Sequence, residues 1–157
     1  MKFRDFVCYE AIRAALGADD KPGVIREFAA LLAGAGRVLD ADKLAEVVLE
    51  REAQGSTGIG DGIAIPHAKS PAVREPVVVF GRSVRGVDFQ TLDGRPAHLF
   101  FLLVSPTDRP GDHLKTLARI SRIVRNAGLR ERLLASSGRD EIQRLILDED
   151  QKYSGNR

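Results

Sequence analysis

A histidine that directly follows a proline, at the end of a short apolar run, is the residue best placed to do chemistry in this chain. His67 comes after Gly62-Ile63-Ala64-Ile65-Pro66. Because Pro66 has no backbone N–H and a fixed φ, a strand over 63–65 must stop there, and His67 begins whatever follows. An imidazole is a nucleophile and a proton acceptor near neutral pH. The placement suggests a chemical role for His67, but position alone favours an ordinary structural histidine, because most single histidines are satisfied structural groups.

A loop rich in glycine and hydroxyl groups precedes this strand, with the sequence Gly55-Ser56-Thr57-Gly58-Ile59-Gly60. Its backbone N–H groups and the hydroxyls of Ser56 and Thr57 can donate to a small oxyanion. The loop lacks the Gly-Lys-Ser/Thr of a P-loop, and it follows a helix and precedes a strand, the reverse of the order found at nucleotide phosphates. We therefore expect it to bind a phosphoryl group rather than ATP or NAD, with Ser56 and Thr57 as phosphate-binding residues.

Histidine suits phosphoryl capture because one ring nitrogen is unprotonated at neutral pH and the phosphoramidate it forms stays reactive. The transferring group carries negative charge on three peripheral oxygens, so a guanidinium and a second imidazole are expected nearby. Arg51 and His113 are the candidates. Each also has an ordinary explanation: Arg51 as a cation in the last turn of a helix, and His113 as a first-turn residue bonded to solvent.

Three histidines leave open a metal-dependent hydrolase that uses His67, His98 and His113. Their positions show none of the tight ligand spacing typical of zinc sites, and in a strand His98 would point away from the neighbouring Leu99. We therefore predict no metal site.

Composition limits the class of protein. A chain of 157 residues is expected to form one domain over 1–157, and its single cysteine, Cys8, indicates a reducing cytoplasm. The longest apolar run is six residues, Leu99 to Val104, far short of the roughly 20 that cross a bilayer. With 24 basic and 22 acidic side chains, the charge is too balanced for a dedicated nucleic-acid binder. We expect neither nucleic acid nor membrane insertion.

Helices are predicted before and after a central group of strands. The first should run from an N-cap at Asp20 to Gly34 or Gly36, and the second from Asp40 or Asp42 to Gly55. The second should carry Arg51 in its last turn, and an inner face of Leu44, Val47, Val48 and Ala53. The first twenty residues fit either a strand or a helical turn.

Strands are predicted at 63–65, 76–84 and 97–104, the last apolar enough to be central in a sheet. A helix capped by Asp112 should follow, and two more at 129–135 and 141–147, with a frayed tail over 148–157 beyond a core of about 20–147. The Asp112 helix should face inward with Leu114, Leu117, Ile120, Ile123 and Val124. This order predicts an α/β (α+β) fold, a three-layer αβα sandwich with a central mixed β-sheet.

The motifs together resemble a known family. The segments Glu50-Arg51-Glu52, Gly55 to Gly60 and Gly62 to Ala68, continued by Leu92-Asp93-Gly94 and Asp112-His113-Leu114, are similar to the active-site signature of the enzyme IIA domains of the bacterial phosphoenolpyruvate-dependent sugar phosphotransferase system. They match the fructose, mannitol and nitrogen-regulatory class of these domains, from about residue 20 to 147.

The resemblance implies an activity. His67 would accept a phosphoryl group on Nε2 from the phosphocarrier protein HPr and pass it to a IIB domain, with Arg51 and His113 in supporting roles. Transfer between histidines is nearly balanced in free energy, so positioning and charge neutralisation suffice, and we expect no cofactor.

Two residues depart from the nitrogen-regulatory branch. Many of its members have another histidine where this chain has Lys115 and a glycine where it has Ala68, which favours a sugar-type or divergent member. The alternative function is a nitrogen-regulatory type of binding module, whose phosphorylation at His67 controls partner proteins without sugar transport.

Overall fold

A mixed sheet forms the middle layer of the protein, whose computed structural model describes residues 2–154. Within these residues the sheet has five strands. β5 is central: β4 pairs with it antiparallel along one side, while β2 and β3 pair with it parallel along the other. β1 adds to β2 in an antiparallel pair. The strands are β1 Gly58–Gly60, β2 Ile63–Ala64, β3 His67–Lys69, β4 Val77–Val87 and β5 Ala97–Ser105.

β2 and β3 lie end to end along one side of β5 and are separated by Ile65 and Pro66. Pro66 offers only its carbonyl, which accepts from the N–H of Leu103 at 3.0 Å. The strand predicted at 63–65 therefore does stop before the proline, and His67 begins the next strand opposite Leu103. Because no further strand is paired beyond β3 within the described chain, His67 stands at an edge of the sheet.

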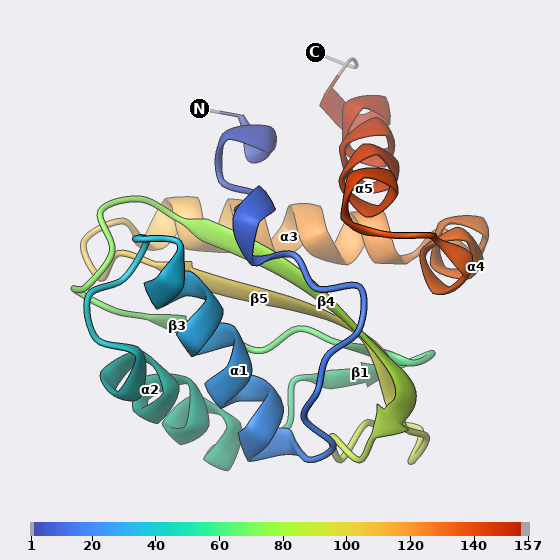
Figure 1. Cartoon of the computed structure of the whole chain (residues 1–157). Coiled ribbons are helices and arrows are strands. Elements are labelled where there is room, and N and C mark those ends of the chain that lie inside the picture. The colour runs from blue at the N-terminus through green and yellow to red at the C-terminus, as the bar shows by residue number, and fades with distance from the viewer. Residues whose placement is uncertain (1, 155–157) are drawn as a thin grey trace.

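Helices cover both faces of the sheet, which confirms the predicted three-layer αβα sandwich (Figure 1). α1 (Lys21–Gly34) and α2 (Ala41–Ala53) pack on one face. α3 (Pro110–Val124), α4 (Ala127–Ala135) and α5 (Arg139–Ser154) pack on the other.

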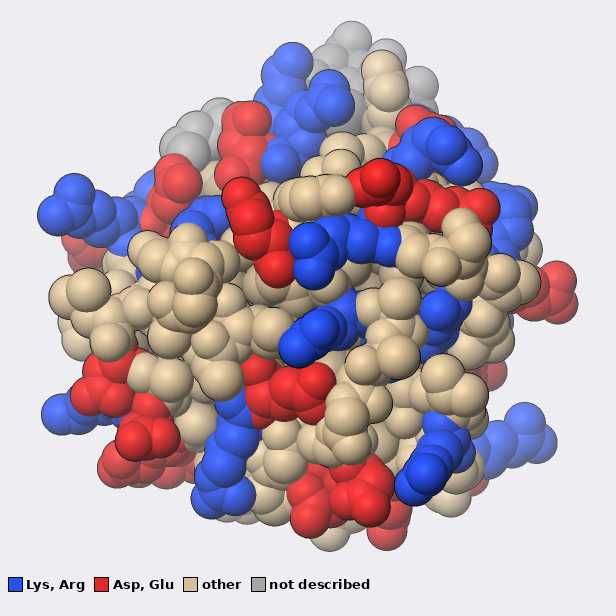
Figure 2. Space-filling view, viewed as in Figure 1, with Lys and Arg blue, Asp and Glu red and all other residues tan. Residues whose placement is uncertain are grey.

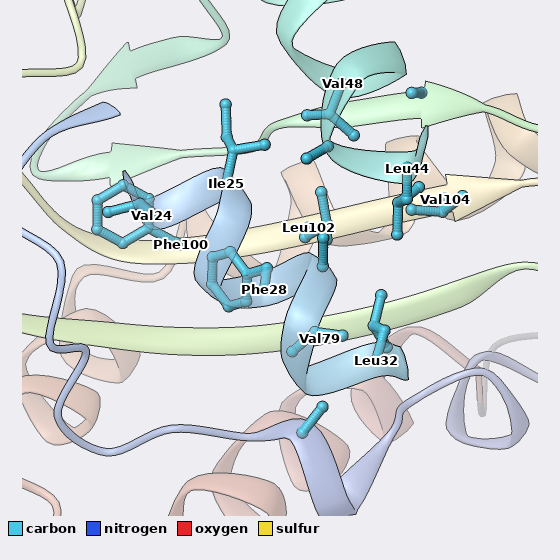
Figure 3. Close-up of a cluster of buried hydrophobic side chains, with 14 of the residues drawn as sticks. Val24, Ile25, Phe28, Leu32, Leu44, Val48, Val79, Phe100, Leu102 and Val104 are labelled. Atoms are coloured by element: carbon cyan, nitrogen blue, oxygen red, sulfur yellow. The ribbon is translucent and has the colours of Figure 1, made fainter. Parts of the chain in front are cut away.

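The alternation of side chains along β5 divides the core in two. Phe100, Leu102 and Val104 point toward α1 and α2, where they meet residues such as Phe28 and Leu44 (Figure 3). Leu99, Phe101 and Leu103 point toward α3 and α5. A strand buried on both faces needs a continuous apolar run. The interpretation of 97–104 as a central strand is thus confirmed.

The first helices begin where predicted. The carboxylate of Asp20 accepts from the N–H of Gly23 at 2.7 Å, and that of Asp40 from the N–H of Lys43 at 3.1 Å. Both are N-caps that satisfy donors with no partner inside the helix. The prediction of Ala53 on the inner face of α2 was wrong: Ala53 is exposed, and Glu52 is buried instead.

The first twenty residues line the outer edge of β4. They contain two 3-10 turns, Phe3–Asp5 and Tyr9–Ala11. Between and after them the chain pairs with β4: the N–H of Cys8 donates to Val78 at 2.8 Å, and the N–H of Arg13 to Phe80 at 3.1 Å. The segment protects an edge that would otherwise present unpaired backbone groups.

The predicted cap of α3 was wrong. The helix begins at Pro110, with Arg109 at the N-cap, because a proline fits the first helical position, where no N–H is needed. Asp112 lies inside the first turn and pairs with Arg109. Leu114 was also misplaced: 66% of it is exposed, whereas His113 and Thr116 are buried.

The predicted fraying after residue 147 was wrong as well. α5 continues to Ser154, and Glu149 and Asp150 are buried. Asn126, Lys152 and Tyr153 donate to the Glu149 carboxylate, and Asp150 pairs with Arg119. Polar residues are held here by partners that the local sequence does not reveal. Residues 155–157 of the predicted tail lie outside the described part.

Charges of both signs are interspersed on the face shown in Figure 2, which has no continuous basic patch. None of the helices within the described chain combines the length and apolar character that a bilayer crossing requires.

Candidate functional site

His67 is oriented by its own backbone neighbourhood. Its Nδ1 lies 2.7 Å from the carbonyl oxygen of Ile65. Because a carbonyl oxygen only accepts, Nδ1 carries the hydrogen of the neutral ring, and Nε2 keeps its lone pair. The ring is thus held in one orientation, and His67 as a whole is only half-buried.

His113 lies beside His67. It is in the first turn of α3 and only 5% exposed, and its ring centroid lies 5.6 Å from that of His67. Its Nδ1 is 2.7 Å from the hydroxyl oxygen of Ser105, at the end of β5. The two histidines, 46 positions apart in the sequence (113 − 67), thus form a pair between the sheet edge and α3.

Arg51 completes the group from the other side of β3. It lies in the last turn of α2, is half-buried, and its Nη1 donates to the carbonyl of Gly55 at 2.9 Å. β3 is an edge strand, so α2 and α3 can both reach past it. They enclose a pocket of about 400 Å³ lined by Val47, Glu50, Arg51, Gln54, His67, Ala68, Lys69, His113, Leu114 and Leu117.

Both histidines are held in their neutral form. Burial lowers the pKa of His67, and the Arg51 charge adds to this, while the bond to Ile65 and the charge of Glu52 oppose it. Burial lowers the pKa of His113 further, to about 4, with contributions from His67 and Lys69. The pocket contains one carboxylate, that of Glu50, against the two cations Arg51 and Lys69, so its net positive charge suits an anion, and the two neutral imidazoles present an uncharged nucleophile to it.

The His113 shift predicts that the protein loses stability in acid. The unfolded chain protonates this ring near pH 6.5, the folded protein only near pH 4, so between these values the unfolded state binds more protons. The contribution of His113 to the free energy of unfolding is therefore fully present above pH 6.5 and is lost as the pH drops toward 4. The loss is on the order of 3 kcal/mol, at about 1.4 kcal/mol per pKa unit.

Urea unfolding of the wild type and of His113→Asn at about pH 7 and about pH 4.5 measures this contribution. The variant is expected to lose less stability than the wild type on acidification, because its residue 113 has no proton to take up. The same loss in both proteins would contradict the assignment.

Ser56 and Thr57 do not line the His67 pocket. The Ser56 hydroxyl donates to the carbonyl of Phe89 at 2.6 Å, and the buried Thr57 hydroxyl donates to the carboxylate of Glu52. The loop hydroxyls thus hold the loop in place.

The sequence places Glu52 in the signature segment but predicts no role for it; in the structure it is buried next to Arg51 and bonded to Lys21 and Thr57. A signal was available, since Leu44, Val48 and Glu52 recur every four residues on one face of α2. A glutamate on an apolar stripe indicates a buried, partnered carboxylate.

His98 lies away from the pair. It is on β5, five residues before the Leu103 that pairs with His67, a separation of about 17 Å along a strand. Its Nδ1 is 2.9 Å from the carbonyl of Ser83. In the described part of the chain, no group of three or more His, Cys, Asp or Glu residues could hold a metal ion.

Comparison with known proteins places the chain in a family. Residues 6–149 match the model of "Phosphoenolpyruvate-dependent sugar phosphotransferase system, EIIA 2". The chain is 39% identical over 150 residues to the fructose-specific EIIABC component of Bacillus subtilis; the match covers 96% of this chain but only 24% of that protein. It is 38% identical over 148 residues to the nitrogen regulatory protein of Bradyrhizobium diazoefficiens, covering 93% of this chain and 95% of that one.

Solved structures share the fold. The nitrogen regulatory protein IIA-Ntr of Neisseria meningitidis superposes with a TM-score of 0.85 at 28% identity, covering 91% of this chain and 97% of that chain. The Escherichia coli complex of enzyme IIAMtl with phosphorylated enzyme IIBMtl gives a TM-score of 0.74 at 23% identity, covering 88% and 95%; at that identity the likeness concerns the fold alone. On the match over residues 6–149 and the similarity to the Bradyrhizobium protein over 148 residues, this chain belongs to the EIIA 2 family of the phosphoenolpyruvate-dependent sugar phosphotransferase system.

Proposed function

We propose that this protein is a phosphoryl carrier, a phosphotransferase component that accepts a phosphoryl group on His67 and passes it on. The observation that carries the proposal is the bond from Nδ1 of His67 to Ile65, which leaves the lone pair on Nε2 of a histidine that lines a pocket. In the step, Nε2 attacks the phosphorus of a donor phosphohistidine. The N–P bond of the donor breaks, its electron pair returns to the donor ring, and a new N–P bond forms on His67.

Charge neutralisation comes from the groups around the pocket. Arg51 and Lys69 are cations that line it and can approach the peripheral phosphoryl oxygens. His113 is neutral at physiological pH and can donate an N–H to the same oxygens or to the partner. Ser56 and Thr57, which the sequence suggested as phosphate ligands, act in this proposal by holding the preceding loop.

The partners are proteins in this proposal. The donor is the phosphocarrier protein HPr and the acceptor a IIB domain, a proposal supported by the family and by the IIA–IIB complex among the structures of the same fold. The exposed Leu114 lies at the rim of the pocket, as a docking surface requires. Such an exchange takes place in the cytoplasm.

Incubation of the protein with phosphoenolpyruvate, enzyme I and HPr tests the proposal. One phosphoryl group per chain is expected, stable in alkali and labile in acid, as a phosphohistidine is. Mass spectrometry should place it on the peptide that contains His67. An unlabelled protein, or an acid-stable phosphoester, would overturn the proposal.

A second candidate is a regulatory module, and the similarity to nitrogen regulatory proteins over nearly the full chain favours it. Phosphorylation at His67 would then add negative charge and change the affinity for a target protein. This candidate predicts that the phosphorylated protein labels no IIB domain, while its affinity for a target depends on phosphorylation. Transfer of the label to a IIB domain favours the carrier instead.

A further inference from the structure

We propose that Glu52 is a positioning residue for His67 and acts through a line of hydrogen bonds that passes Thr57 and Ile65. The inference rests on the proposed function only because it takes from it the reaction of His67. The line itself begins at a buried ion pair and ends at the ring nitrogen that does not react.

The first link is the Glu52 carboxylate at the end of α2. Its side chain is 3% exposed. Lys21 Nζ donates to Oε1 at 2.8 Å, the N–H of Thr57 donates to the same oxygen at 3.2 Å, and the Thr57 hydroxyl donates to Oε2. A carboxylate is stable in the interior only when it is paired and hydrogen-bonded. These contacts therefore fix the position of Thr57 relative to α2.

The second link runs from Thr57 to the reactive histidine. The N–H of Ile65 donates to the carbonyl of Thr57 at 3.0 Å, and the carbonyl of Ile65 accepts from Nδ1 of His67 at 2.7 Å. Ile65 lies in the break between β2 and β3, so neither group takes part in the pairing with β5. The neighbours of Ile65 are held by β5, but the direct hydrogen bond to Ile65 itself comes from the loop that Glu52 holds, and this bond helps to place the oxygen that orients the imidazole.

The network is anchored beyond the loop. Lys21 Nζ also donates to Gln90 Oε1 at 2.9 Å and lies 4.6 Å from the centre of the Phe89 ring. Ser56 donates to the carbonyl of Phe89. The start of α1, the end of α2 and the segment after β4 therefore converge on residues 56–57.

Glu52 and Arg51 are adjacent in sequence and act on His67 in opposite senses. The Glu52 charge raises the pKa of His67, whereas the Arg51 charge lowers it. A buried ion pair contributes little net stability compared with apolar packing. Placement of Thr57, and through it of His67, accounts for a charged pair at this point of the core.

Glu52→Gln tests the inference, because glutamine keeps the shape and one acceptor but loses the charge and the second acceptor. The rate constant for phosphoryl transfer to His67 should fall about 10- to 100-fold, the range for slight misplacement of a reacting group. KM for the phosphorylated donor should not change, because Glu52 does not line the pocket surface. A fall in affinity with an unchanged rate constant would contradict the inference.

A second readout needs no phosphoryl donor. Ring ¹⁵N shifts of neutral His67 should show one tautomer in the wild type, with hydrogen on Nδ1, and a mixture of both in Glu52→Gln. If the wild type is not phosphorylated but the tautomers change as expected, the proposed function fails and the positioning role stands. If the folded variant keeps a single tautomer and the wild-type rate, the positioning role fails.

Glu149→Gln is the matched control. Glu149 is also 3% exposed and paired with a lysine, Lys152, but it lies on α5. The Glu149→Gln substitution should lower stability without changing the tautomer of His67 or the rate of phosphoryl transfer. Thr57→Val, which removes one donor and leaves the Lys21 pair intact, should move both readouts in the same direction by less than Glu52→Gln. Thr57→Ser, which keeps the hydroxyl, should show the wild-type tautomer and the wild-type rate. If Glu149→Gln and Glu52→Gln change the tautomer and the rate to the same extent, the proposal is overturned.

Discussion

Replacement of His67 by alanine is expected to abolish phosphoryl labelling. A carrier cannot proceed without the atom to which the group is attached, so the loss should be complete rather than graded. The fold should persist, because the His67 side chain is half-buried at a pocket and is not part of either hydrophobic core cluster. Incorporation of label from phosphoenolpyruvate, with circular dichroism to confirm folding, measures both outcomes.

His98→Ala is the control for this result. His98 is also a partly buried histidine with a carbonyl partner, but it lies near the opposite end of β5. The His98→Ala protein should take up as much label as the wild type. Label that remains on His67→Ala, at His113 or elsewhere, would show that the nucleophile has been misassigned.

Replacement of Arg51 by glutamine is expected to slow labelling of His67 about 100- to 1000-fold, the usual cost of removing a group that stabilises developing charge. Arg51→Lys should recover part of this rate, because it keeps the charge but not the planar fork of donors. The structure places the Arg51 guanidinium on the Gly55 carbonyl, at the rim of the pocket. A short movement can therefore bring it to an incoming phosphoryl group. Rapid-quench measurement of the first-order transfer rate gives the comparison.

Arg95→Gln serves as the matched control, because Arg95 is an exposed arginine that lines a different pocket near His98. Its transfer rate should equal that of the wild type. Equal rates for Arg51→Gln and the wild type would mean that Arg51 only caps the end of α2.

The sequence was most informative where one residue type has one physical use. Pro66 predicted the break between β2 and β3, the run from Leu99 to Val104 predicted the central strand, and Asp20 predicted the start of α1. Each of these depends on local chemistry alone: a missing donor, a continuous apolar run and a side-chain cap. The three-layer fold followed from the order of these elements.

The features that the sequence did not reveal depend on contacts between distant segments. The N-terminal segment is fixed by the edge of β4, and the polar end of α5 by Arg119 and Asn126. Periodicity cannot reveal such partners. The misplacement of Leu114 has a related cause, since a pocket at the end of a helix exposes an apolar residue that an amphipathic pattern assigns to the core.

The sequence named the residues that the structure brings to one pocket, but not the residues that hold them in place. The structure brings together His67, Arg51 and His113 around one pocket, while Glu52 and Ser105, which hold Thr57 and His113, were not anticipated. Supporting groups are common residue types with no distinctive spacing. Their role becomes visible only when the hydrogen bonds are known.

Because β3 has only three residues and begins directly after Pro66, the number of residues before His67 decides which face of the sheet its side chain occupies. The three residues alternate, so that Ala68 faces α1 and α2 while His67 lies opposite Leu103 on the α3 side. Insertion of one residue between Pro66 and His67 would turn the side chains of His67 and the rest of β3 to the opposite face. Substitutions in β3 can lower activity by degrees, whereas one inserted residue would turn the imidazole away from its pocket in a single step.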